Sequence, residues 1–327
     1  MQTKAQTTKY TKVKFVLLAL LVMALWGSLY PMVKIGYQTL GIRGGETAEI
    51  LMYSGLRFFL CGAVMSGMAF VRKDKISVPK RKSIVGILGV GLFAIALNYA
   101  FVNVGLSLTD SSKTAILKQL GGLLYVCFAF LFFKSEKFSV WKMVGAAVGF
   151  AGIVAINFSG AGLCFSVGDI LIIFSSVCTV AGSVFNKKIA AENSPFWITG
   201  ISQLVGGALL MIAALAMGAD MLIFGWASFG VFLYLGVAST LAYLLWSYIL
   251  KSIDLSNMFI IKFAEPLFAC LFGAILLQEN IWHWQYLLAF VLVSAGIAMG
   301  HITQKERRKK GERVSVDGKD GLTIREE

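Results

Sequence analysis

The chain has 327 residues, of which 57% are apolar and 14% charged, and its mean hydropathy is +0.77. Soluble proteins carry about a quarter charged residues, so this composition excludes an ordinary soluble enzyme. The formal charge of +13 does not indicate nucleic-acid binding, because the basic residues flank apolar segments and do not form a basic face on a folded domain.

Ten apolar segments are each long enough to cross a bilayer as a helix, which takes about 20 residues. They are residues 14–36, 48–71, 83–103, 112–133, 140–157, 168–189, 195–217, 226–250, 257–277 and 282–300. Because backbone amides in hydrocarbon need internal partners, these segments are predicted to be helical. No connection between them exceeds 11 residues, so the sequence predicts an all-α membrane protein with ten transmembrane helices.

Lysine and arginine are distributed unevenly between the two sides of these segments. Of the 30 basic residues, 23 belong to the two tails and the even-numbered connections, whereas the odd-numbered connections contain only Arg43. Since basic residues stay on the cytoplasmic side, both termini are predicted to be cytoplasmic. Topology explains these charges, and we expect the basic loops and tail to contact anionic lipid and no nucleic acid.

Polar residues recur in the same order in the two halves of the sequence. Residues of the first half have counterparts 143 or 144 positions later, in the pairs Asp110 and Asp254, Lys118 and Lys262, Glu136 and Glu279, and Trp141 and Trp284. Gly27-Ser28 likewise matches Gly182-Ser183. Because five helices per half is an odd number, the halves are inverted repeats, an arrangement typical of secondary transporters. The predicted repeats are residues 14–157 and 168–300, between tails 1–13 and 301–327.

Several segments resemble EamA-type members of the drug/metabolite transporter superfamily. They are ALWGSLYPMVKIG in the first helix, LRFFLCGAV with Arg57 in the second, GDILIIFSSVCTVAGSVFNKKIA at the start of the second repeat, and FAEPLFACLFGAILLQENI in the ninth helix. The sequence departs from the pattern at Gly121-Gly122, where the first repeat lacks the Glu-Pro pair. The resemblance implies ten helices around a central cavity and export of small organic solutes by secondary transport.

Three basic residues lie deep in the predicted helices. Arg57 lies about 15 Å from the start of its helix at 1.5 Å per residue, where a charge costs about 2.5–3.5 kcal/mol. We therefore expect it to face the bundle interior, either in a substrate site or in a structural pair. Lys118 and Lys262 either approach the central axis or reach back to the nearer surface. Basic residues close to helix ends are interpreted as headgroup anchors, namely Lys34, Lys113 and Lys142.

Glu265 is a carboxylate deep in a predicted helix, beside a proline. Pro266 removes one backbone donor and crowds the carbonyl of Lys262, as expected at a substrate or coupling site. Alternatively, Glu265 pairs with Lys262 three residues earlier. The three deep basic residues and Glu265 give the core a net charge of +2, which favours carboxylates or phosphates over lipophilic cations. The predicted substrate is an anionic or zwitterionic metabolite such as an amino acid or organic acid.

Neutral polar and aromatic residues are candidates for the cavity wall, but each type has a structural alternative. Polar side chains also form interhelical hydrogen bonds, and aromatic rings also anchor helices at the interface. The candidates, with the proline above, are Trp26, Tyr30, Asn98, Tyr99, Gln119, Gln203, Tyr243 and Pro266. Gly145 and Gly149 permit close helix packing, either within a monomer or across a homodimer.

These features predict a secondary transporter of the bacterial inner membrane, or of an equivalent membrane, that exports a small metabolite by alternating access. Coupling to protons through Glu265 and coupling to an exchanged solute both fit the sequence. One alternative is an exporter of cationic drugs with the same fold. A membrane-embedded enzyme or lipid-handling protein is disfavoured, because the sequence contains no catalytic constellation, Walker motif, metal-ligand cluster or cofactor motif.

Overall fold

The computed structural model describes residues 2–71, 81–132, 140–159, 162–189, 193–250, 264–296 and Met299. Each of the ten predicted segments contains helix within these residues. The elements are α1 Gln2–Leu40, α2 Thr47–Val71, α3 Arg81–Val90, the π-helix η1 Gly91–Leu97, α4 Asn98–Ser107, α5 Ser111–Lys118, α6 Leu120–Phe132, α7 Val140–Ile156, β1 Phe158–Ser159, β2 Gly162–Leu163, α8 Val167–Ile189, α9 Pro195–Ala216, α10 Trp226–Leu250, α12 Ala264–Leu277, and a last apolar helix, Trp284–Gly296.

The helices present apolar side chains to their surroundings, as an integral membrane protein requires. Five helical stretches are long and apolar enough to span a bilayer by themselves, and four further apolar helices are shorter in the described part of the chain. Large apolar side chains such as Phe70, Val85 and Ile212 are exposed on the outside of the bundle. Polar residues such as Arg57 and Asn103 are instead buried between helices. The chain is therefore a multi-pass membrane protein.

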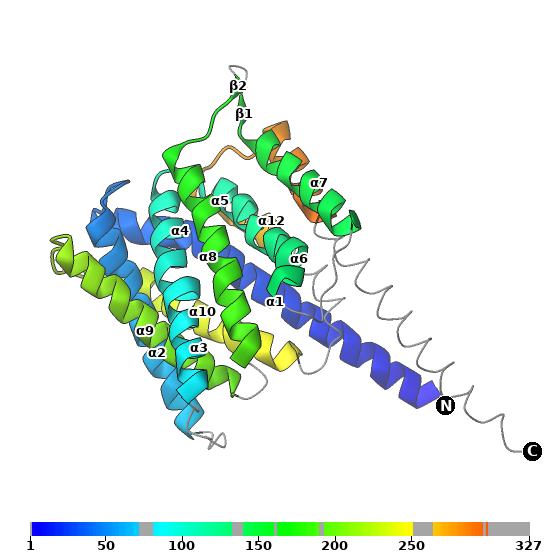
Figure 1. Cartoon of the computed structure of the whole chain (residues 1–327), viewed down its shortest axis with the longest axis horizontal. Coiled ribbons are helices and arrows are strands. Elements are labelled where there is room, and N and C mark those ends of the chain that lie inside the picture. The colour runs from blue at the N-terminus through cyan, green and yellow to red at the C-terminus, as the bar shows by residue number, and fades with distance from the viewer. Residues whose placement is uncertain are drawn as a thin grey trace, which may run out of the picture.

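Corresponding helices of the two halves of the chain make corresponding contacts with the opposite half. In the first half, α1 packs against α10 and α12 of the second half; in the second half, α8 packs against α3, η1, α4 and α6 of the first (Figure 1). The second helices of the halves, α2 and α9, pack against each other. Two equivalent repeats related by a central axis would produce this pattern of contacts. The first helix of each repeat packs against the third and fourth spans of the other repeat.

Glycines set the distance between α2 and α9. A Cβ atom added to Gly55 would lie 2.8 Å from the carbonyl oxygen of Gly207, and one added to Gly207 would lie 2.7 Å from that of Gly55. Two helical turns further along α2, a Cβ atom added to Gly62 would lie 2.8 Å from the carbonyl oxygen of Gly200. The two backbones are therefore in direct contact, which side chains at these positions would prevent.

The same kind of contact joins the last helices of the two halves. A Cβ added to Gly145 of α7 would lie 2.5 Å from the carbonyl oxygen of Gly296, and one added to Gly296 would lie 2.7 Å from the backbone nitrogen of Gly149. Figure 1 shows α7 beside the orange C-terminal helix. The structure thus places the Gly145 and Gly149 contact within one chain, which resolves the two alternatives left by the sequence.

Three features of the helices differ from the sequence prediction. The helix α1 begins at Gln2, before the predicted start at residue 14. The third span contains the π-helix η1, whose wider turns fit against glycines of its neighbours: a Cβ at Gly182 of α8 would lie 2.5 Å from that of Ala94. The fourth span is divided at Gln119 into α5 and α6. Hydropathy does not reveal such interruptions, because they leave the apolar composition unchanged.

Candidate functional site

A cavity of about 400 Å³ lies between the two repeats. Its wall comes from α1, α2, α3, η1, α4, α5 and α6 of the first repeat and from α8, α9, α10 and α12 of the second. Its described wall includes most of the candidates named from the sequence: Trp26, Tyr30, Arg57, Asn98, Tyr99, Lys118, Gln119, Gln203 and Glu265. Residues spread over the whole chain therefore meet around one space.

Arg57 is buried in the wall of this cavity. Its side chain is 4% exposed, and its Nε and Nη1 atoms have no hydrogen-bond partner among the described residues. The guanidinium lies 4.5 Å from the ring centroid of Phe58 and 5.9 Å from that of Tyr99. The rings hold the cation through cation–π contacts but supply no acceptor for its N–H groups. Arg57 is thus fixed in position, with two buried donor atoms left unpaired among the described residues.

Lys118, the last residue of α5, is held by neutral oxygens from other helices. Its Nζ donates to Asn98 Oδ1 at 2.5 Å, Thr179 Oγ1 at 2.8 Å and Ser175 Oγ at 3.0 Å. Asn98 directly follows the π-helix, and the other two residues belong to α8. These contacts match the three protons of an ammonium group. Lys118 therefore points into the bundle. The alternative from the sequence, in which it reaches back to the membrane surface, was wrong.

Glu265 faces the cavity from α12 and connects to the first helix. The Tyr30 hydroxyl donates a hydrogen bond to Glu265 Oε1 at 3.3 Å. Close approach of the two helices is made possible by Gly27, where an added Cβ would lie 2.8 Å from the Glu265 carbonyl oxygen and 2.7 Å from Phe268 Cβ. The carboxylate and the tyrosine hydroxyl together form an acidic part of the wall, contributed by both repeats.

The remaining candidates from the sequence do not line the cavity or lie outside the described residues. Pro266 is buried, and it is not among the described lining residues. Lys262 and the side chain of Tyr243 fall outside the described part of the chain. The pairing of Lys262 with Glu265 therefore stays a prediction.

Several small polar residues of the wall were missed by the sequence analysis. They belong mainly to α8 and α9 and are Thr179, Ser183, Asn186 and Thr199, with Ser239 from α10. Ser183 carried a signal, because it matches Ser28 in the other repeat. The others had none, since serine, threonine and asparagine in apolar helices face cavities and neighbouring helices alike.

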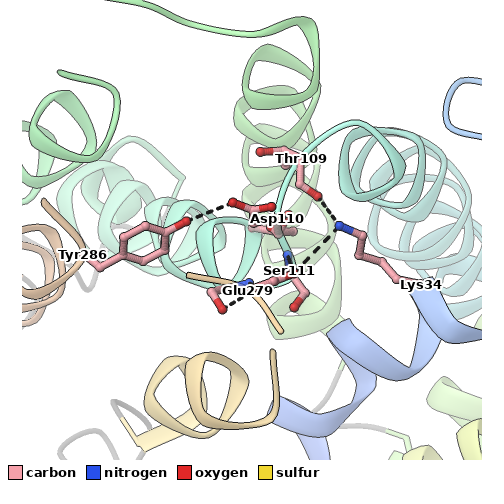
Figure 2. Close-up of polar contacts among 8 residues, drawn as sticks. Lys34, Thr109, Asp110, Ser111, Glu279 and Tyr286 are labelled. Atoms are coloured by element: carbon pink, nitrogen blue, oxygen red, sulfur yellow. Dashed lines mark hydrogen bonds and ion pairs between the residues drawn. The ribbon is translucent and has the colours of Figure 1, made fainter. Parts of the chain in front are cut away.

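Two of the predicted headgroup anchors are instead bonded inside the protein. Lys113 Nζ lies 2.8 Å from Oδ2 of the fully buried Asp169. Lys34 Nζ donates to the Thr109 carbonyl at 2.9 Å and lies 3.8 Å from Glu279 Oε1 (Figure 2). The anchor interpretation of both lysines was wrong, because their acceptors come from segments far away in the sequence. The side chain of Lys142 lies outside the described residues.

Two helical repeats around a shared cavity are an arrangement typical of membrane transporters. Within the described residues no group of three His, Cys, Asp or Glu side chains is placed to hold a metal ion. The profile of the EamA-like transporter family matches residues 13–158 and, a second time, residues 166–300. The chain belongs to the EamA-like transporter family.

Curated relatives cover most of the chain at low identity. The uncharacterized inner membrane transporter YedA of Escherichia coli K12 is 26% identical over 277 residues, which are 83% of this chain and 85% of YedA. The uncharacterized transporter YoaV of Bacillus subtilis is 24% identical over 90% of this chain and 99% of its own length. A probable amino-acid metabolite efflux pump of Salmonella typhimurium is 24% identical over 89% of this chain and 96% of its own.

A solved crystal structure has the same fold. It superimposes with a TM-score of 0.59 over 90% of this chain and 98% of that one, at 19% sequence identity. This likeness shows the fold alone; the doubled family match is what makes the chain a secondary transporter of a small molecule.

Proposed function

We propose that this transporter exports a small anionic or zwitterionic organic metabolite by alternating access. The observation that carries the proposal is Arg57, which lines the cavity with two buried donor atoms and no partner for them among the described residues. A guanidinium offers paired N–H groups that match a carboxylate or a phosphate. Charged groups at membrane depth face the bundle interior and mark substrate paths.

The balance of charge around the cavity supports the same class of substrate. The ionisable residues of the described wall that are charged at neutral pH are two cations, Arg57 and Lys118, and one carboxylate, Glu265. A net positive wall of low polarity attracts anions and disfavours lipophilic cations. The acidic part formed by Glu265 and Tyr30 provides a place for the ammonium group of a zwitterion or for a coupling proton.

Two further expectations belong to this proposal. The Salmonella relative is named as a probable amino-acid metabolite efflux pump, which supports amino acids as the first substrates to test. The distribution of basic residues supports cytoplasmic termini and hence a bacterial inner-membrane orientation with the basic tail on anionic lipid. Coupling to protons and coupling to an exchanged solute remain two variants of the same mechanism.

The test has two stages and uses the purified full-length protein. A thermal-shift screen against amino acids, organic acids, sugar phosphates and quaternary ammonium compounds first identifies ligands. Proteoliposomes loaded with the radiolabelled ligand then report efflux with and without an imposed pH gradient. We expect stabilisation and transport by carboxylate-bearing compounds. A strict preference for quaternary ammonium compounds would overturn the proposal and favour a cation exporter.

A further inference from the structure

A cluster of polar contacts joins the two repeats at one end of the cavity. Its members are Lys34 of α1, Thr109 before α5, Ser111 and Ser112 at the start of α5, and Glu279 after α12; we call this set the latch (Figure 2). Glu279 comes from the second repeat and the other members from the first. The latch therefore connects parts of the chain that must move relative to each other if the cavity is to open at this end.

Glu279 supplies the cap of a helix that belongs to the other repeat. Its carboxylate accepts hydrogen bonds from the Ser111 nitrogen at 2.6 Å, the Ser112 nitrogen at 3.0 Å and the Ser112 hydroxyl at 2.6 Å. The first N–H groups of a helix have no partner within it, and a nearby anion stabilises them. The residue preceding α5, Asp110, makes no side-chain capping bond and accepts instead from the Tyr286 hydroxyl at 3.2 Å. The start of α5 thus depends on Glu279.

Lys34 adds a third element to the same point. Its ammonium donates to the Thr109 carbonyl at 2.9 Å and lies 3.8 Å from the Glu279 carboxylate, whose side chain is 6% exposed. A carboxylate this deeply buried needs its donors, since leaving it without them costs more than an ordinary hydrogen bond. Separation of these contacts must therefore be accompanied by entry of water.

The latch directly follows the residues that form one end of the cavity wall. Val33 and Leu106 line the cavity, are almost fully buried, and precede Lys34 and Thr109 by one and three positions. Toward the other end the lining continues to Asn186, near the end of α8. On the orientation proposed above, the latch lies at the external end of the cavity.

We propose that the latch is the external gate of the transporter, held shut when Glu279 caps α5 and released when this cap breaks. The inference rests on the proposed alternating-access function and adds the contact that must open for a solute to leave. Because three hydrogen bonds meet at a single carboxylate, displacement of Glu279 breaks all of them together. The closed gate is thus stabilised by interactions between repeats, while each repeat keeps its own helices.

Gly273 of α12 offers a way to disturb the latch without changing a charge. A Cβ atom added there would lie 2.6 Å from both Glu279 Oε2 and the Ser112 hydroxyl, so alanine at this position has to displace them. Gly230 of α10 provides the matched control, because a Cβ added to it meets no atom within 4 Å. For the carboxylate itself the control is Glu46, which accepts from the Arg43 nitrogen within a single connection of the same end.

The experiment measures access to the cavity and not transport. In a variant whose five native cysteines are replaced by alanine, Val33→Cys reports the rate of labelling by the membrane-impermeant reagent sulfonatoethyl methanethiosulfonate. The reagent is applied separately to intact cells and to inverted membrane vesicles, so that the side of entry is known. We expect Glu279→Gln and Gly273→Ala each to raise the rate from outside about tenfold or more, from the loss of charge-assisted hydrogen bonds.

The controls decide the outcome. The proposal is supported if Glu46→Gln and Gly230→Ala leave the external labelling rate unchanged while the two latch variants raise it. It is overturned if the latch variants label no faster than the controls, or if all four variants label faster to a similar extent. Should Glu279→Gln not reach the membrane, Gly273→Ala alone decides in the same way. Because labelling needs no substrate, these results are independent of which solute the protein transports.

Discussion

In the cavity, Arg57 keeps two buried donor atoms without a partner among the described residues, whereas in the latch Glu279 accepts three hydrogen bonds within 3.0 Å. Both groups are charged and nearly inaccessible, yet one is held by aromatic rings and the other by backbone and hydroxyl donors. A charge whose polar atoms are all engaged stabilises one arrangement of helices. A charge that is rigidly held and keeps unpaired donors is the kind of group that we propose to bind the substrate.

Replacing Arg57, the charge with unpaired donor atoms, should produce the largest effect on substrate binding. We expect Arg57→Ala to weaken substrate binding at least about a hundredfold, because two hydrogen bonds to a charged group contribute about 1.5–3 kcal/mol each. The measurement is the dissociation constant of the identified ligand, together with initial uptake in proteoliposomes.

Arg43→Ala is the matched control for this change, since Arg43 is exposed in a connection. Native affinity in the Arg57 variant would show that the guanidinium has a packing role, and the contrast with the latch would then disappear.

The acidic part of the cavity wall is expected to give the next largest effect. Glu265→Gln keeps an acceptor for the Tyr30 hydroxyl but removes the charge and the titrating proton. We predict an initial uptake rate about tenfold lower, comparable to the loss of one charge-assisted hydrogen bond, with no response to an imposed pH gradient. Substrate exchange at equal pH serves as the control for intact protein. A gradient response equal to that of the native chain would exclude Glu265 as the coupling group.

Lys118 lies in the cavity wall like Arg57, but its ammonium group is fully hydrogen-bonded like the carboxylate of Glu279. Its replacement tests whether such a residue serves stability or substrate binding. Lys118→Met leaves the oxygens of Asn98, Ser175 and Thr179 without this donor, which costs about 1–3 kcal/mol for an unmet buried group. We expect the thermal unfolding midpoint in detergent to fall by several degrees.

Lys188→Met, at an exposed position near the end of α8, is the comparison for this change. An unchanged midpoint combined with a large loss of ligand affinity would assign Lys118 to substrate binding instead.

Lys34 should give the smallest effect. Its ammonium is 3.8 Å from Glu279 and its side chain is 22% exposed, and partly solvated ion pairs contribute about 0–1 kcal/mol. Lys34→Gln, which retains a donor for the Thr109 carbonyl, is expected to raise external labelling of Val33→Cys at most about fivefold. A larger increase than that caused by Glu279→Gln would mean that the ion pair, and not the helix cap, closes this end.

The architecture could be predicted from the sequence because lipid imposes strong rules. Apolar segments long enough to span the membrane have to be helices, and the repeated order of polar residues indicated the duplication. The same depth argument placed Arg57 and Glu265 in the interior, where both line the cavity. These inferences needed only the composition of single helices and a comparison of the two halves of the sequence.

What the sequence did not reveal depends on partners from distant segments. Lys34 and Lys113 resemble anchors when viewed on their own helices, and their acids, Glu279 and Asp169, approach them only through packing of the other repeat. The π-helix before Asn98 arises where α8 and α9 present glycines to the third span. Such features are properties of the assembled bundle, and no periodicity in a single helix encodes them.

The glycine contacts between α2 and α9 have a consequence for how this protein evolves. Added Cβ atoms at Gly55, Gly62 and Gly207 would all lie within 2.8 Å of the opposite backbone. Even a methyl group is therefore excluded there unless both helices shift together. We therefore expect these sites to accept glycine alone, while lipid-facing positions accept exchanges among apolar residues.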